Sequence, residues 1–305
     1  MIKIYKYTFL ILGISVFTSC KQSSKPTQTT REGSATFVAD ETFKPIIDDE
    51  LYIFHNTYPN AQIKVRYEPE RTVLNEFLNN DTTRVAILAR ELTQKERKVF
   101  LDKKIVIRTN RFVIDGIALI ANTASLDTGV TVQEIINLMQ SKPSNIKKLV
   151  FDNANSSTVR YLKELSNVKK LPTTGIYALQ SNPEVIKFVS ENTGALGVVG
   201  VNWLIDPKND LKPAVDKIKI LGVKNLQGKK GADKFYEPDQ NNLALGLYPL
   251  TRNVYIIDCQ GGTGLGTGFA SFIAGETGQR IVLKSGLLPD SIPPRELIIR
   301  KTLEK

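Results

Sequence analysis

The chain is poor in the residues that bind transition metals or carry redox chemistry. Its 305 residues include one histidine and two cysteines. A single histidine excludes His-rich metal centres and leaves a Ser-His-Asp triad little support. His55 lies in a segment with helical apolar spacing, so we expect it to be structural, and Cys259 is typical of a small buried apolar residue. We therefore predict no metal site and no cofactor.

Basic residues outnumber acidic ones, 41 Lys and Arg against 31 Asp and Glu, and the formal net charge is +10. These basic residues are scattered along the chain and are not interleaved with aromatic residues in one run. A nucleic-acid interface usually gathers them into a stripe or patch. We therefore predict a solvated basic surface and no binding of nucleic acid.

The first twenty residues have the pattern of a secretion signal. Lys3 and Lys6 precede an apolar stretch at 9–17 that is too short to span a bilayer as a permanent helix. Cys20 follows directly after small residues, which resembles the lipobox of bacterial lipoproteins. That resemblance implies a palmitate-carrying Cys20 as the first mature residue and a location in the cell envelope, anchored by lipid and facing the periplasm. Ordinary cleavage near Cys20 without a lipid is the alternative.

Alternating strand and helix patterns begin after this segment. Apolar alternation with helical stretches between predicts three strands, at 61–67, 84–89 and 104–108. This order is typical of an open α/β sheet, in which ligands lie beyond the carboxyl ends of the strands. Arg71 and Arg90 fall just beyond two such ends, and each is also consistent with a surface ion pair.

Two long apolar strands indicate that the chain leaves this sheet and returns to it. The stretch 113–122 predicts a crossing into a second lobe, and 248–257 predicts the return. The fold class is therefore α/β, with two lobes of mixed sheets flanked by helices and joined by two hinge crossings. Capping-box patterns, Thr93 with Glu96 and Thr131 with Glu134, predict the starts of two helices. The predicted segments are a signal peptide at 1–19, a lipidated tether at 20–32, lobe I at 33–113 plus 247–292, lobe II at 114–246 and a tail at 293–305.

The stretch 149–165 has the pattern of an anion site. An apolar strand and a polar turn lead to Ser156, Ser157 and Thr158, which open a helical pattern. Free N–H groups and the positive end of the helix dipole hold oxyanions at such a position, and Arg160 would add a planar charged fork. The alternative is a plain helix cap.

Several motifs together resemble one family. Gly33 to Phe37 looks like its first anion loop, and Asn155 to Thr158 looks like its second. Three further motifs follow in order: 194–200, 248–252 and 278–289. The chain is similar to the periplasmic phosphate-binding proteins of bacterial ABC importers, with the type 2 periplasmic-binding-protein fold, in a lipoprotein form.

The resemblance implies two lobes that close on a dehydrated oxyanion, like a Venus flytrap. The predicted anion-binding residues, from the motifs and from the strand ends together, are Ser34, Thr36, Phe37, Arg71, Arg90, Ser156, Ser157, Thr158 and Arg160. Two residues depart from the family pattern. Ser157 stands where the family has glycine, and Arg90 stands where some members have an aspartate that accepts the proton of hydrogen phosphate. Arginine accepts no hydrogen bond, which leaves Asp40, Glu70 or Asp115 as the candidate acceptor.

Our leading hypothesis is a solute-binding lipoprotein, not an enzyme. It would capture inorganic phosphate or a related oxyanion for an ABC permease, as a monomer held at the membrane by its N-terminal lipid. One alternative is a phosphatase-like enzyme with a cleft serine as nucleophile, although no histidine lies near in sequence to act as its base. Another is a structural or signalling lipoprotein that keeps the fold without the ligand.

Overall fold

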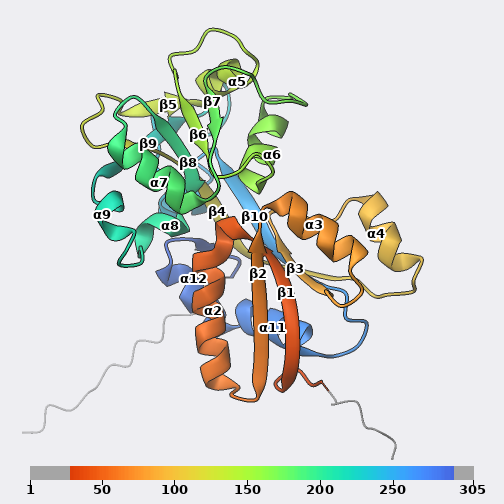
Figure 1. The fold of residues 1–305 in the computed structure, drawn as a ribbon. Helices are drawn as coiled ribbons and strands as arrows, with labels where there is room; N and C mark the ends of the chain where they lie inside the picture. Colours follow the sequence, from red (N-terminus) through yellow and green to blue (C-terminus); the bar gives the residue numbers. More distant parts are fainter. Residues whose placement is uncertain (1–27, 292–305) are drawn as a thin grey trace, which may run out of the picture.

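The computed structural model describes residues 28–291, which form two α/β lobes, one above the other in Figure 1. The predicted signal peptide, Cys20, most of the tether and the C-terminal tail lie outside the described residues. Within 28–291, no helix is both long enough and apolar enough to cross a membrane.

The first lobe is built on five neighbouring strands, in the order β2-β1-β3-β10-β4. β1 runs parallel to β2 and β3, whereas β10 runs antiparallel to β3 and β4. Helices cover the sheet on both sides (Figure 1). The elements are β1 (Gly33–Asp40), η1 (Glu41–Phe43), α2 (Lys44–Thr57), β2 (Ala61–Glu68), α3 (Glu70–Asn79), β3 (Val85–Leu88), α4 (Gln94–Leu101), β4 (Arg108–Asn122), β10 (Thr251–Asp258), α11 (Leu265–Ala274), α12 (Glu276–Lys284) and β11 (Leu288–Pro289).

The second lobe continues the sheet through β8, β6 and β7, all of them beyond β4. β6 is parallel to β7 and β8, and β9 pairs with β4 and β5. The elements are β5 (Gly129–Thr131), α5 (Val132–Met139), β6 (Leu149–Phe151), α6 (Ser157–Leu165), β7 (Ile176–Ala178), α7 (Asn182–Glu191), β8 (Leu196–Gly200), α8 (Asn202–Ile205), α9 (Lys212–Val215) and β9 (Ile218–Lys224), and α10 (Gln240–Ala244) lies on the return to the first lobe.

β4 is the strand that joins the two lobes. Its first part, up to Gly116, pairs with β10, and from Ile117 onward it pairs with β8 and β9. The return crossing lies beside it, because the N–H of Ile117 donates to the carbonyl of Leu250 at 2.9 Å. The predicted two-lobed α/β fold with mixed sheets is therefore confirmed, whereas the lobe boundaries at 113/114 and 246/247 stay predictions.

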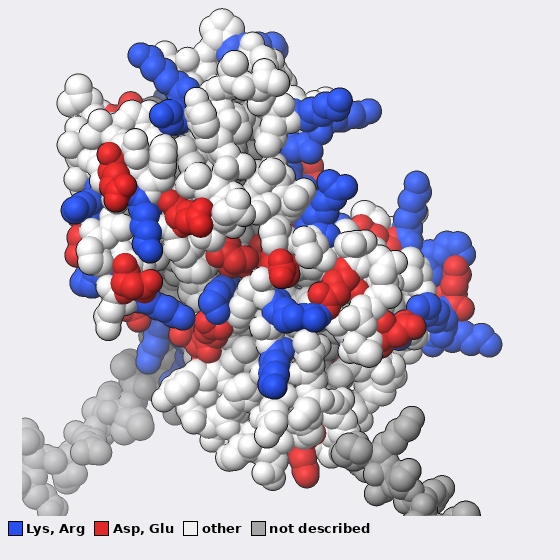
Figure 2. Space-filling view, viewed as in Figure 1, with Lys and Arg blue, Asp and Glu red and all other residues white. Residues whose placement is uncertain are grey.

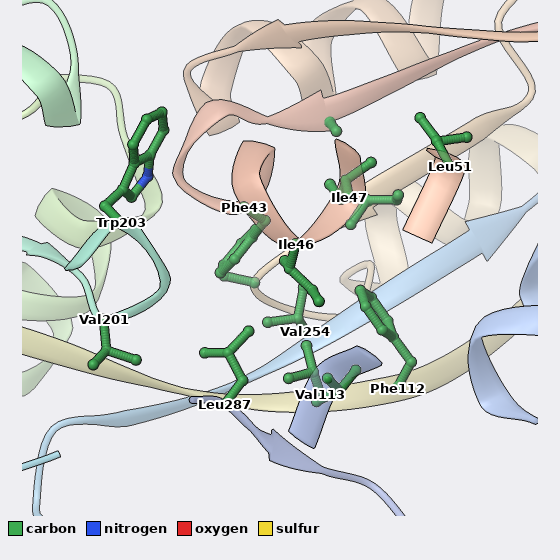
Figure 3. Close-up of a cluster of buried hydrophobic side chains, with 14 of the residues drawn as sticks. Phe43, Ile46, Ile47, Leu51, Phe112, Val113, Val201, Trp203, Val254 and Leu287 are labelled. Carbon is green, nitrogen blue, oxygen red and sulfur yellow. The ribbon is translucent and has the colours of Figure 1, made fainter. Parts of the chain in front are cut away.

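An apolar cluster ties the lobes together on one side of the crossing. Figure 3 shows Trp203 and Val201, from the second lobe, next to Phe43 and Leu287 of the first. The indole Nε1 of Trp203 also donates to the carbonyl of Thr42 at 2.9 Å. Burying a large apolar side chain contributes about 1.5–3 kcal/mol, so this cluster helps to hold the two lobes together.

Three local predictions need correction. Residues 33–37 form no loop, because they pair in register with β2 as the first half of β1. The predicted strand 104–108 is not formed apart from Arg108, which begins β4, and β4 runs on through 113–122 because 108–111 also pair with β10. The sequence also predicts a single helix from Phe269 to Leu283, whereas the structure has two, α11 and α12, divided at Gly275, whose N–H donates to the carbonyl of Phe272 at 3.0 Å.

The histidine and the buried cysteine have the structural roles expected of them. His55 accepts a hydrogen bond at Nε2 from the N–H of Ile63, at 3.2 Å. Cys259 is buried, and its burial raises the pKa of the thiol to about 12.

Candidate functional site

The N-terminus of α6 faces the space between the lobes. The Oγ of Ser156 caps the helix by accepting from the N–H of Val159 at 3.2 Å, and Val159 and Leu162 bury the inner face. Within residues 28–291, the N–H groups of Ser157 and Thr158 donate to no other group. They are the free donors that an anion meets at a helix start.

A buried arginine lies directly behind this helix start. Arg252 comes from β10, and its side chain is only 2% exposed. Its Nη1 donates to the Oγ of Ser157 at 2.8 Å and to the Oγ1 of Thr158 at 3.2 Å. Because both hydroxyl oxygens accept from Arg252, their protons are directed toward other acceptors.

The charge of Arg252 is balanced inside the protein. Its Nε donates to Asp115 at 2.8 Å, and its guanidinium lies 4.8 Å from the ring centroid of Phe43. Its Nη2 has no partner among the described residues.

We did not predict Arg252 as a site residue, although one signal was present, namely an arginine inside the apolar strand 248–257.

The segment that faces α6 from the first lobe is not the one we predicted. β1 ends at Asp40, and the N–H of Thr42 donates to Asp40 Oδ1 at 3.1 Å. The hydroxyl of Thr42 reaches Asp152 at 3.4 Å, across the cleft. The loop beside the cleft is therefore Asp40–Phe43.

The dipeptide Thr-Phe occurs twice, six residues apart, and the structure brings only the second copy to the cleft. Ser34 and Thr36 line a separate pocket with Lys64 and Arg84 at the amino end of β1, and Phe37 is buried in the core. Ser34, Thr36 and Phe37 therefore do not lie beside the start of α6, because strand pairing with β2 carries the chain past them before it reaches the cleft.

Two of the predicted arginines are engaged in ion pairs at the mouth of the cleft. Arg160 on α6 donates from Nε and Nη2 to the two oxygens of Glu70, the latter at 3.0 Å, and from Nη1 to Glu164 at 2.9 Å. Arg90 donates to both oxygens of Glu96 at 2.8 Å. Their charges are therefore largely satisfied within the protein.

Two cavities of opposite charge meet at the start of α6, and both include Asn155 and Ser156 in their walls. In the band between the lobes, Figure 2 shows acidic side chains beside Lys and Arg side chains that project from the α6 and α4 side. The basic cavity, of about 550 Å³, has charged lining residues Glu70, Arg71, Arg90, Arg160, Lys163, Glu164 and Lys169. The acidic cavity, of about 370 Å³, has charged lining residues Asp40, Glu41, Glu68 and Asp152.

Comparisons with known proteins agree with this architecture. A sequence model of the PBP superfamily domain matches residues 23–277. The chain belongs to this superfamily.

Similar proteins span nearly the whole fold. Phosphate-binding protein PstS of Pseudomonas aeruginosa is 20% identical over 284 residues, which cover 84% of this chain and 83% of that protein. A Clostridium perfringens structure with bound phosphate gives a TM-score of 0.69 at 18% identity and covers 85% of this chain and 100% of that chain. An ABC-type phosphate transport receptor from Vibrio cholerae gives 0.63 at 18% identity, covering 84% and 100%. These likenesses establish the shared fold.

Several carboxyl groups of this PBP superfamily member are shifted toward their protonated form. Burial, followed by the charge of Glu70, raises the pKa of Asp40 to about 7, against the opposing effects of Arg252 and Ser157. Burial also raises the pKa of Glu41 to about 7 and raises that of Asp152. Near pH 7, Asp40 and Glu41 therefore each carry a proton part of the time.

The described residues of this PBP superfamily member contain no group of three or more His, Cys, Asp or Glu arranged to hold a metal ion.

Arg71, the remaining predicted arginine, is exposed, and its backbone N–H donates to the carbonyl of Asn155 across the cleft at 3.2 Å. Among the predicted residues, Arg71, Arg90, Ser156, Ser157, Thr158 and Arg160 thus lie around one cleft.

Proposed function

We propose that this protein is an extracytoplasmic solute-binding protein that captures phosphate, or a related oxyanion, in the interlobe cleft and delivers it to an ABC permease. The observation that carries the proposal is the start of α6. There the N–H groups of Ser157 and Thr158 have no acceptor within residues 28–291, and Arg252 lies behind them. The names of the relatives support phosphate as the ligand.

In this proposal the anion is held mainly by oriented neutral donors. The helix start supplies partial positive charge, and the hydroxyl of Thr158 donates outward because its oxygen accepts from Arg252. Closure of the lobes removes water, which strengthens each of these interactions. Ser157 fits the site without crowding it, because its side chain points back to Arg252 at 2.8 Å.

We further propose that Cys20 carries the lipid that holds the protein at the membrane as a monomer facing the periplasm, and that it is not an enzyme. A cleft serine would need a general base. The one histidine, His55, accepts a hydrogen bond from the N–H of Ile63, which lies at the end of β2 far from the cleft. No observation favours the phosphatase alternative over binding.

Calorimetry of the mature chain, from Cys20 onward, tests this function directly. We expect one phosphate per chain, and sulfate and molybdate define its selectivity. The absence of heat with all three anions would refute the proposal.

A matched pair of variants then locates the site. Thr158→Ala should weaken phosphate binding by about 1–3 kcal/mol, as expected for a lost hydrogen bond to a charged group. Thr36→Ala, which removes the same group at the amino end of β1, should leave the affinity unchanged. The reverse result would move the site to the pocket beside Ser34.

A further inference from the structure

Among the described residues, no basic side chain lines the acidic cavity to balance its carboxyl groups. Four carboxyl groups line it, and no Lys, Arg or His of the described residues does. Its other lining residues are mostly hydroxyl and amide side chains, with Ser156 at the boundary to the basic cavity. An oxyanion alone would meet like charge in this space.

Asp40 is the carboxyl group in this cavity with a buried oxygen that lacks a hydrogen-bond donor among the described residues. It is 1% exposed, its Oδ1 accepts from the N–H of Thr42, and its Oδ2 has no partner among the described residues. The charged groups that face it are Glu70 from α3, Arg252 from β10 and the neighbouring Glu41. Arg252 already pairs with Asp115 at 2.8 Å, so Asp40 shares this counter-ion with a second buried carboxyl group. A buried carboxylate oxygen without a donor is costly.

The neighbouring acids are satisfied only by neutral donors. Asn182 donates from Nδ2 to Glu41 at 2.9 Å and to Asp152 at 3.3 Å. The hydroxyl of Thr42 and the N–H of Asn153 also donate to Asp152, at 3.4 and 2.9 Å. These amide and hydroxyl contacts stabilise the carboxyl groups without neutralising them, and burial raises the pKa of each.

We propose that the ligand carries a cationic amine beside its oxyanion, as in a short aminoalkyl phosphate or phosphonate. This inference rests on the proposed function, since the oxyanion is placed at the start of α6. Ser156 lies in the walls of both cavities, so an amine one short alkyl chain away from the anion enters the acidic cavity and donates to Asp40 Oδ2 and Glu41.

Three ligands separate this inference from the proposed function: inorganic phosphate, ethyl phosphate and 2-aminoethyl phosphate. The last two differ by the amine alone. Calorimetry of the mature chain at pH 7 should show 2-aminoethyl phosphate binding about 10- to 150-fold more tightly than ethyl phosphate, the range for a hydrogen bond to a charged group. Equal affinity of the two esters overturns the inference and leaves the proposed function standing if phosphate binds. No binding of any of the three overturns the inference, and the sulfate and molybdate titrations then decide whether the proposed function falls with it.

A variant assigns the effect to the acidic cavity. Asp40→Asn keeps the shape and removes the charge, so the ratio of the affinities for 2-aminoethyl phosphate and ethyl phosphate should fall at least tenfold. Asp127→Asn, at an exposed loop of the second lobe, is the matched control and should keep the full preference. A preference unchanged by Asp40→Asn would contradict the placement of the amine, and the thermal midpoint of each variant checks that it is folded.

Discussion

Replacing Arg252 by methionine should destabilise the fold as well as the site. The guanidinium is the ion-pair partner of Asp115, which is 0% exposed and whose Oδ1 has no other partner in the described chain. Methionine fills a similar volume but leaves a buried carboxylate without its counter-ion. Breaking a buried pair in this way costs about 3–5 kcal/mol.

The loss should grow with pH. Burial already raises the pKa of Asp115, and Arg252 opposes that shift. Without Arg252 the pKa rises further in the folded state, so the folded chain binds a proton that the unfolded chain has lost. Stability then falls as pH rises above the ordinary pKa of aspartate. The variant should therefore be closest to the wild type near pH 4 and furthest from it near pH 8.

Urea unfolding followed by circular dichroism measures this difference. Lys98→Ala is the control, because its exposed pair with Asp102 is expected to contribute less than about 1 kcal/mol. The double variant Arg252→Met with Asp115→Leu should recover most of the loss, since the Asp115 carboxylate is removed together with its counter-ion. A loss below about 1 kcal/mol that does not change with pH would refute the view of Arg252 as the counter-ion of Asp115.

Two further variants test buried and interlobe carboxyl groups. Burial, with Asp49 next, raises the pKa of Glu50 to about 9, and neither of its oxygens has a partner in the described chain. Wild-type stability should therefore fall from about pH 5 to 9, and urea midpoints of Glu50→Gln should show a flatter profile. Glu70→Gln weakens the interlobe pair with Arg160, so small-angle scattering of the ligand-free chain should show a larger radius of gyration, whereas Glu164→Gln, within α6, should not.

The helix starts were predictable because their signals are local. The capping boxes at Thr93 and Thr131 are both formed, and each depends on residues only three positions apart. The same holds for the strand, turn and helix of 149–165, which form as predicted. Short-range hydrogen bonding and apolar spacing determine these elements, so one stretch of sequence is enough to find them.

The composition of the cleft was less predictable because it depends on distant residues. Arg160 pairs with Glu70, 90 positions away, and Arg252 reaches Ser157, 95 positions away. The error in the first loop has a related cause, since Thr36-Phe37 and Thr42-Phe43 are alike locally. Only the register of β1 with β2 decides which of them reaches the carboxyl end of the strand.

A crystal structure of the mature chain grown with phosphate is the most direct test of the central claim. We predict one phosphate at the start of α6, within hydrogen-bond distance of the N–H groups of Ser157 and Thr158. A phosphate bound instead beside Ser34, Lys64 and Arg84, or a cleft that stays free of it at saturating concentration, would contradict the account.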